Sequence, residues 1–379
     1  MPVPSDWISP VLKLLLQSLD GVLPAVGGAM EDMEQPDVDE LEDMLVNRET
    51  REVTEFLETP PPSVQNLYRP TPPLFRQDLH FYHYFIDGSI KTYYLATGIE
   101  QQRSFPIELA QIGSAVMERD DRGYVHPLKI MHRVLLLLPK GPLGVSDTVW
   151  QELKKLDTPD SFFEVIDTTE RTSHTPLDPT SENLRTRAGG IARNRMHRLE
   201  IEIIQATEEN RCEDCWLILD GAVKLDDFIR APYLIGVAKN FRKDPEFRFG
   251  RGHTARKDIT SVLAGLPYAH RTVAFSAHGG QVAFWYVRLR EQKELDFPLM
   301  GVVKVELPRS DRTPVEADLA DLISRTLVAE RNVTPHGLDR RWHCHLYPIY
   351  QAEQAIKNRF YSRDVLMGMI HWPQPHIIP

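Results

Sequence analysis

Two apolar runs that each end in an aspartate and a glycine constrain this chain more than any other feature. They are Phe85-Ile86-Asp87-Gly88-Ser89 and Leu217-Ile218-Leu219-Asp220-Gly221. A short apolar run closed by a turn signal is typical of a buried strand. A carboxylate where such a strand runs out is poorly solvated, and a bound metal ion is the usual way to stabilise it. The sequence therefore predicts two buried strands that place Asp87 and Asp220 beside a divalent metal ion.

A helix between these strands offers a third carboxylate. We expect residues 183–205 to be helical, although Gly189-Gly190 weakens the start of that segment. Glu200 falls within the apolar arc of this helix. Glu202 instead lies beside two arginines with which it can form ion pairs across one turn. We therefore favour Glu200 over Glu202 as a metal ligand.

Three carboxylates with no clustered sulfur suit Mn²⁺ or Mg²⁺ better than zinc. Such ions activate water and stabilise the leaving oxygen when a phosphodiester is hydrolysed. An apolar run ending in Asp-Gly is common by itself, so the signal lies in the order of all three acidic residues: Asp87, Glu200 and Asp220. The pattern favours a metal-dependent phosphodiester hydrolase.

The charge of the chain is unevenly distributed. Its formal net charge is −10, and residues 1–62 alone carry 14 acidic and 3 basic side chains, so the rest of the chain is close to neutral. The acidic segment predicts either a solubilising leader or an arm that meets a basic partner. Only three cysteines are present, and neither a signal peptide nor a membrane-spanning stretch is recognisable. We expect a cytoplasmic protein with no membrane partner.

The predicted organisation is an α/β fold with a mixed sheet flanked by helices, preceded by an acidic, partly helical extension over residues 1–62. An apolar helix over residues 7–22 and the acidic arm are the expected material for dimerisation or partner docking. Prolines 60–73 mark the boundary of a domain that covers 63–379. Within it we expect strands at 81–86 and 91–96 joined by a hairpin through Asp87-Gly88-Ser89, a helix at 106–118 and a strand at 128–138. Residues 151–182 resemble a polar surface insertion.

A basic stretch rich in aromatic residues follows another apolar run, Leu234-Ile235-Gly236-Val237-Ala238. Over residues 239–257, lysines and arginines alternate with phenylalanines and glycines. Basic side chains neutralise phosphates and aromatic rings stack on bases, so this composition favours a DNA-binding surface over an ordinary solvated loop. The candidate DNA-binding residues are Lys239, Arg242, Lys243, Arg248 and Arg251.

The order of these motifs resembles the NurA nuclease family over about residues 80–360. The resemblance rests on Ile86-Asp87-Gly88-Ser89, Arg198-Leu199-Glu200, Leu217-Ile218-Leu219-Asp220-Gly221, Leu234-Ile235-Gly236-Val237-Ala238-Lys239 and Leu346-Tyr347-Pro348-Ile349. It implies an RNase H-like core, a homodimer, and degradation of DNA with Mn²⁺ or Mg²⁺. It also implies a HerA-type hexameric ATPase as the partner in the processing of DNA ends for repair.

The resemblance assigns roles to five residues. It makes Asp87, Glu200 and Asp220 the metal ligands, Lys239 a contact to the phosphate, and Tyr347 an active-site residue. It also predicts a histidine or another polar residue in the helix after Tyr347. That helix contains no histidine here, although His343 and His345 lie just upstream.

Several alternatives stay open at this point. The chain could be a non-catalytic RNase H-like subunit that docks on a DNA-translocating ATPase, or a phosphohydrolase of small substrates. The spacing of Cys212 and Cys215 is that of half a zinc site, which His343 and His345 would have to complete. A cysteine–histidine nucleophile at residues 343–345 is disfavoured, because neighbours in an extended strand face away from each other.

Overall fold

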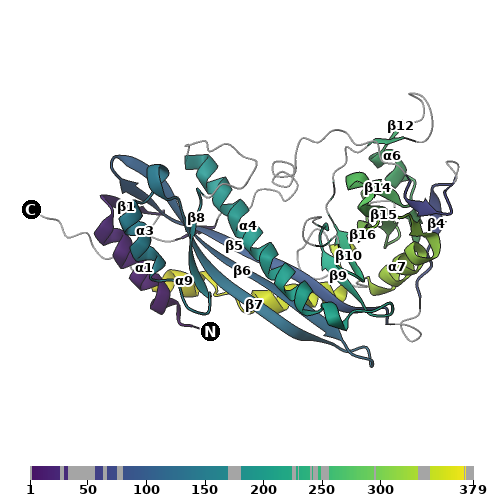
Figure 1. The fold of residues 1–379 in the computed structure, drawn as a ribbon, viewed down its shortest axis with the longest axis horizontal. Coiled ribbons are helices and arrows are strands. Elements are labelled where there is room, and N and C mark those ends of the chain that lie inside the picture. The colour runs from purple at the N-terminus through teal and green to yellow at the C-terminus, as the bar shows by residue number, and fades with distance from the viewer. Residues whose placement is uncertain are drawn as a thin grey trace, which may run out of the picture.

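Three long antiparallel strands form the spine of the molecule (Figure 1). They are β5 (Tyr82–Glu100), β6 (Arg103–Arg119) and β7 (Val125–Leu138). The computed structural model describes residues 2–25, 30–32, 56–62, 66–74, 80–169, 181–223, 228, 230–239, 241, 246–248, 256–293, 296–331, 342–370 and 372. Adjacent long strands of this kind are stabilised along their whole length by their shared ladder, so the spine is extended and continuous.

Two short buried strands continue the sheet beside β5. They are β9 (Trp216–Asp220), parallel to β5, and β10 (Leu234–Ala238), parallel to β9. Both are apolar throughout except for Asp220, as expected for strands covered on both faces.

The sheet then turns antiparallel on one side and ends in a short parallel strand on the other. Beyond β10 lie β16 (Val302–Pro308), β15 (Val282–Arg288), β13 (His270–Thr272) and β4 (Tyr68–Pro70), and β8 (Phe163–Asp167) pairs with β7 at the opposite end. Short strands at the margins are β1 (Gly21–Pro24), β2 (Glu31–Asp32) and β14 (Phe275–Ala277). The sheet is therefore mixed, with its parallel part around β9.

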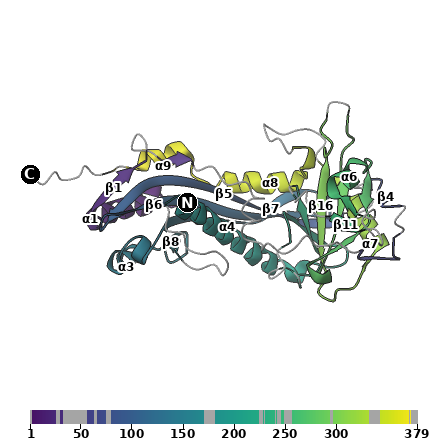
Figure 2. The same cartoon turned by 90° about the horizontal axis from the view of Figure 1, so that it is seen from above.

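Helices cover both faces of the sheet. Figure 2 shows α4 (Ser181–Ala206) on one face of the long strands and α8 (Tyr347–Lys357) on the other. Near the termini, α1 (Pro4–Ser18) lies against α3 (Asp147–Lys154) and α9 (Arg363–Met369). At the other end of the molecule lie α6 (Ile259–Ala264) and α7 (Ala317–Glu330). This arrangement confirms the α/β class with a mixed sheet flanked by helices.

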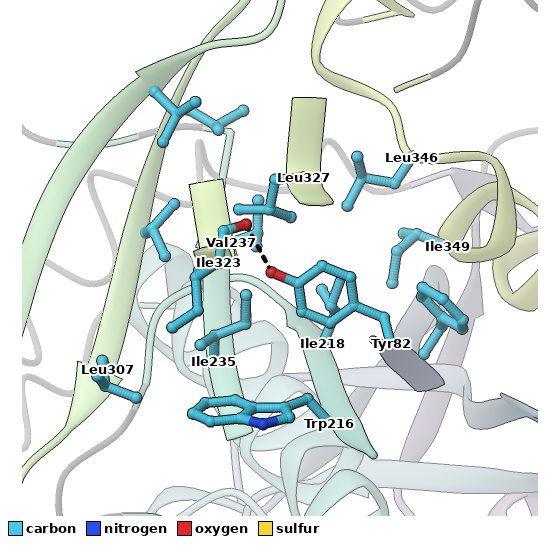
Figure 3. Packing of buried hydrophobic residues seen from close by; sticks show 14 of the residues in the cluster. Tyr82, Trp216, Ile218, Ile235, Val237, Leu307, Ile323, Leu327, Leu346 and Ile349 are labelled. Atoms are coloured by element: carbon cyan, nitrogen blue, oxygen red, sulfur yellow. Dashed lines mark hydrogen bonds between the residues drawn. The ribbon is translucent and has the colours of Figure 1, made fainter. Parts of the chain in front are cut away.

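The largest core cluster lies where β9 and β10 meet α7 and α8. Figure 3 shows Tyr82, Ile218 and Val237 packed against Ile323 and Leu346. The hydroxyl of Tyr82 is buried, and it donates a hydrogen bond of 2.8 Å to the carbonyl of Ile323 in α7. The sheet strands that carry the candidate site are thus anchored to a helix far away in the sequence.

The structure differs from two of the predicted elements. The predicted hairpin through Asp87-Gly88-Ser89 is wrong, because β5 runs straight through these residues and stays paired with β6. The predicted helix at 106–118 is also wrong, because that segment forms β6. Its residues are buried almost without interruption, so the strand shows none of the alternation that would have identified it.

Other predicted segments coincide with regular structure. The helix expected at 183–205 is α4, which Gly189 does not interrupt, and the strand expected at 128–138 is the greater part of β7. Part of the stretch expected to be a surface insertion forms the edge strand β8, whereas 170–180 lies outside the described residues. None of the described helices is both long and apolar enough to cross a membrane.

The N-terminal segment is integrated into the fold where it is described. The apolar helix expected over residues 7–22 is α1, and its side chains Trp7, Leu12 and Leu15 are at most 3% exposed because they pack within this chain. The short strand β3 (Glu58–Thr59) pairs with β17 (Val315–Glu316). The proposed acidic arm falls mostly at 33–55, outside the described residues.

Candidate active site

Two aspartates lie side by side on neighbouring parallel strands. Ile86 of β5 pairs with Leu219 of β9, so the next residues along, Asp87 and Asp220, are also neighbours. Side chains alternate between the faces of a strand, and Phe85 lies in the core beneath α8. Asp87 and Asp220 therefore both point to the α8 face of the sheet.

Lys239 reaches the two aspartates from the end of the next strand, β10. Val237 of β10 pairs with Asp220, which puts Lys239 one step beyond the end of that strand. Its Nζ donates to Oδ2 of Asp220 at 2.8 Å, and its side chain is 10% exposed. The lysine thus brings a positive charge to the pair of aspartates.

The electrostatics of Asp87 are dominated by its burial. Burial raises the pKa of the Asp87 carboxyl well above its ordinary value, and the negative charge of Asp220 raises it further, while Lys239 lowers it. The carboxylate of Asp87 also accepts a hydrogen bond of 2.8 Å from the backbone N–H of Gly88. One ammonium does not offset the burial of Asp87 together with the charge of the partly buried Asp220, so this place favours an additional cation.

Glu200 approaches from the opposite face of the sheet. Gly88 follows Asp87 in β5 and so faces α4, where an added Cβ would lie 2.5 Å from Oε1 of Glu200. Glu200 is 6% exposed, and its Oε2 accepts a hydrogen bond of 2.8 Å from Nδ1 of His197. The glycine of the Asp-Gly motif therefore allows close approach of a helix carboxylate and does not form a turn.

The structure separates the two glutamates of α4 clearly. Glu202 is about half exposed and lies within ion-pair distance of Lys129 and Arg133 on β7. Glu200 is buried beside Gly88. The choice of Glu200 over Glu202 from the sequence agrees with this burial.

Asp87 and Glu200 lie beside a flank of β5 that begins where the pairing of β5 with β9 ends. On the side away from β6, β5 pairs with β9 as far as Ile86, and its next partner there is β2 at Tyr93. Among the described residues, no strand pairs with the flank of β5 between these points. Asp87 and Glu200 lie at the start of this flank on opposite faces of β5, and the negative charge of Glu200 contributes to raising the pKa of Asp87.

The chemical type of the side chains at this place suits a divalent metal ion. Asp87, Asp220 and Glu200 offer hard carboxylate oxygens, which match Mn²⁺ and Mg²⁺. In the described part of the chain, however, no three acidic, histidine or cysteine side chains converge closely enough to hold an ion as they stand. The structure brings together Asp87 and Asp220, and it leaves Glu200 across the strand from them.

A further acidic residue, Glu353, was not singled out from the sequence. It lies on α8, and its negative charge contributes to raising the pKa of Asp87. Glu353 also forms an ion pair of 2.6 Å with Lys357 one turn later. The signal for it was the polar residue expected in the helix after Tyr347. Tyr347 itself begins α8, is 43% exposed, and is too far around the helix to share a side with Glu353.

The basic-aromatic stretch is described only in part. Arg242, Lys243 and Arg251 lie outside the described residues. Arg248 belongs to β11 (Glu246–Arg248), which pairs with β12 (Arg256–Asp258) so that Arg248 is opposite Arg256. The two strands of this ribbon carry three basic and two acidic residues, so its net charge is small.

The structure describes both cysteine motifs: the Cys212–Cys215 spacing of half a zinc site, and the cysteine–histidine pair at residues 343–345. Cys212 and Cys215 flank a tight turn, while His343 and Cys344 belong to the 3₁₀ helix η6 (Trp342–Cys344), not to a strand. The expectation that His343 and Cys344 face away from each other is wrong, since Cys344 Sγ lies 3.0 Å from His343 Nδ1. Both are buried, and the backbone N–H of Gly301 donates to the same nitrogen, so this contact anchors a turn.

Comparison with known proteins adds no relative to this picture. No protein-family model matches the chain, and no curated protein is significantly similar to it in sequence.

Proposed function

We propose that this protein is a divalent-metal-dependent DNA nuclease of the NurA type. The observation that carries the proposal is the pair Asp87 and Asp220 on adjacent parallel strands, with Lys239 at the end of the third. A buried carboxylate next to a second, partly buried carboxylate is costly unless a cation is bound there. A phosphodiester hydrolase is the class of enzyme that needs this grouping next to a basic surface.

The topology supports an RNase H-like core. The order β7-β6-β5-β9-β10 combines three antiparallel strands with two parallel ones, and α4 lies in the connection between the two sets. The resemblance to NurA implies an RNase H-like core, and here Asp87 on β5 and Asp220 on β9 lie where the two sets of strands meet. The fold is hence compatible with the proposed chemistry at the proposed residues.

The chain's own residues have distinct tasks in this proposal. Asp87 and Asp220 would hold Mn²⁺ or Mg²⁺, with Glu200 contributing from the other side of β5; the ion, when bound, activates water and stabilises the leaving oxygen. Lys239 is already aligned on Asp220 and would bind a phosphate oxygen of the substrate. The basic-aromatic stretch after Lys239 in the sequence would follow the DNA backbone.

The same resemblance supplies the cellular setting. We propose DNA as the substrate, a homodimer as the assembly, and a HerA-type hexameric ATPase as the partner in DNA end processing in the cytoplasm. The apolar side of α1 is occupied within its own chain, so the docking surface for a second subunit has to lie on other elements.

The test is degradation of end-labelled linear DNA in Mn²⁺, Mg²⁺ or EDTA. Asp87→Asn and Asp220→Asn should abolish metal-dependent cleavage while the protein stays folded. Glu202→Gln is the matched control for Glu200→Gln, because it removes a carboxylate from the exposed side of the same helix. Wild-type cleavage by either aspartate variant would refute the ligand assignment.

One observation favours a second candidate, a non-catalytic subunit docked on an ATPase. Lys239 already neutralises Asp220 through a direct ion pair, as a degenerate site would need. Such a subunit would bind the ATPase and DNA but would show no cleavage with any metal, with or without its partner.

A further inference from the structure

His197 lies next to Glu200 on the buried side of α4. The two residues are one helical turn apart, and both are nearly inaccessible to solvent, at 7% and 6% exposure. His197 Nδ1 and Glu200 Oε2 are 2.8 Å apart, which is the distance of a strong hydrogen bond to a carboxylate. Nothing in the nuclease proposal assigns His197 a role.

The imidazole is fixed in its orientation by a second contact. Its ring stands edge-on to the ring of Phe228, with centroids 5.3 Å apart and an angle of 89° between planes. Edge-to-face aromatic contacts of this kind restrict rotation of the ring. The hydrogen-bond donor is therefore held at one point above the helix surface.

The hydrogen bond determines where the free oxygen of Glu200 points. A glutamate has three side-chain torsions, and a carboxylate held by one oxygen keeps few of their combinations. With Oε2 bound to His197, Oε1 lies over Gly88, at the start of the unpaired flank of β5. We infer that His197 is a positioning residue, which presents Glu200 Oε1 to the metal site next to Asp87. This inference rests on the proposed function.

A purely structural reading explains the pair less well. Burying a charged or strongly polar pair returns little stability compared with an apolar pair of the same size. The neighbours Leu199 and Ile203 show that this face of α4 accepts apolar side chains. A histidine and a glutamate in their midst are costly, and the cost is understandable if Glu200 has to be held in one place.

The experiment compares two substitutions that differ only in the donor. His197→Phe keeps an aromatic ring against Phe228 and removes the hydrogen bond, while His197→Asn keeps a donor near the position of Nδ1. His132→Phe is the control, because His132 is also a largely buried histidine among aromatic rings and has no described contact with Glu200. Mn²⁺ binding is measured by calorimetry, and cleavage of linear DNA by gel.

We expect His197→Phe to weaken Mn²⁺ binding and cleavage by about tenfold to a hundredfold, the range typical of residues that orient a ligand. His197→Asn should recover most of both, and His132→Phe should match wild type in both. In metal-free protein, the nitrogen NMR signals of His197 should show a hydrogen-bonded Nδ1–H that is lost in Glu200→Leu, which removes the acceptor.

The outcomes separate the two proposals. Unchanged Mn²⁺ affinity and cleavage in His197→Phe, with Asp87→Asn inactive, would overturn the positioning role and leave the nuclease standing. Equal losses in His197→Phe and His197→Asn would also overturn it, since the donor would then be irrelevant. If no variant and no wild-type protein cleaves DNA, the nuclease proposal falls, and Mn²⁺ binding together with the NMR signal still decides whether His197 orients Glu200.

Discussion

Gly88→Ala should impair catalysis far more than it impairs folding. An added Cβ would lie 2.5 Å from Glu200 Oε1, whereas ordinary contact begins at 3.4 Å, so the carboxylate has to retreat by about 0.9 Å. The terminal atoms of Met196, at 2.9 and 3.0 Å, have to move by about half as much. A retreat of that size is enough to break the 2.8 Å hydrogen bond between His197 and Glu200.

Gly88→Ala should lower the stability only slightly and the catalytic rate strongly. Overpacking a close contact costs about 1–3 kcal/mol, and replacing glycine within a strand returns about 0.5–1 kcal/mol. The net loss in the free energy of unfolding is therefore about 0–2.5 kcal/mol. A catalytic group displaced by about 1 Å can cost about a hundredfold in rate. Urea unfolding and Mn²⁺-dependent cleavage of linear DNA measure the two effects separately.

The matched control is the same substitution in the middle of α4. An added Cβ at Gly189 would meet nothing within 4 Å, so Gly189→Ala should stabilise the protein by about 1 kcal/mol and leave cleavage unchanged. If Gly88→Ala cleaves DNA at the wild-type rate, the position of Glu200 does not matter for catalysis. If Gly88→Ala unfolds the protein, Glu200→Ala in the same chain should restore stability, because it removes the Oε1 atom that clashes with the added Cβ.

Three further substitutions test the fold that supports the site. Arg119→Met breaks a buried two-pronged pair with Glu330 and should cost about 3–5 kcal/mol in urea unfolding; a cost below that of an exposed pair would show that the ion pair is not buried in solution. Leu15→Ala removes a fully buried side chain of α1 and should cost about 2–5 kcal/mol, whereas no change would mean that α1 does not pack on this core. Burial raises the pKa of the Glu108 carboxyl well above 4.5, so wild-type stability should fall as the pH rises above that value, and Glu108→Gln should remove this dependence; parallel pH profiles of both proteins would contradict the burial of Glu108.

Local sequence was sufficient for the strand that carries Asp220. The run from Leu217 to Leu219 is apolar without interruption, and only a short strand covered on both faces accounts for it. The same reasoning failed for β6, because a long strand buried on both faces offers no alternating pattern and has the length of a helix. Burial on both sides is a tertiary property, since it depends on α4 and α8, which are remote in sequence.

The Asp87-Gly88 motif shows how one signal supports two structures. Aspartate followed by glycine is typical of a turn, and glycine in a strand is equally typical of close approach by another group. Only the position of Glu200 over Gly88 decides between them, and that depends on how α4 packs. Glu353 was not singled out for a similar reason: a polar residue was expected in its helix, but only the docking of α8 brings Glu353 near Asp87.

The burial of Asp87 has a consequence for how the site is used. Its pKa is raised by burial and by Asp220, so in the absence of a further cation a proton competes for the carboxylate. Lys239 neutralises only part of the charge, and it does so through Asp220. A divalent cation would favour the ionised form of Asp87, while substrate phosphate would give Lys239 an alternative partner. Under the proposed function, Lys239 would exchange the carboxylate of Asp220 for a substrate phosphate, because Asp87 and Asp220 would hold the cation that the site favours. Such an exchange would keep the charge of the buried site balanced before and after substrate binds, which a pair of aspartates without Lys239 could not achieve.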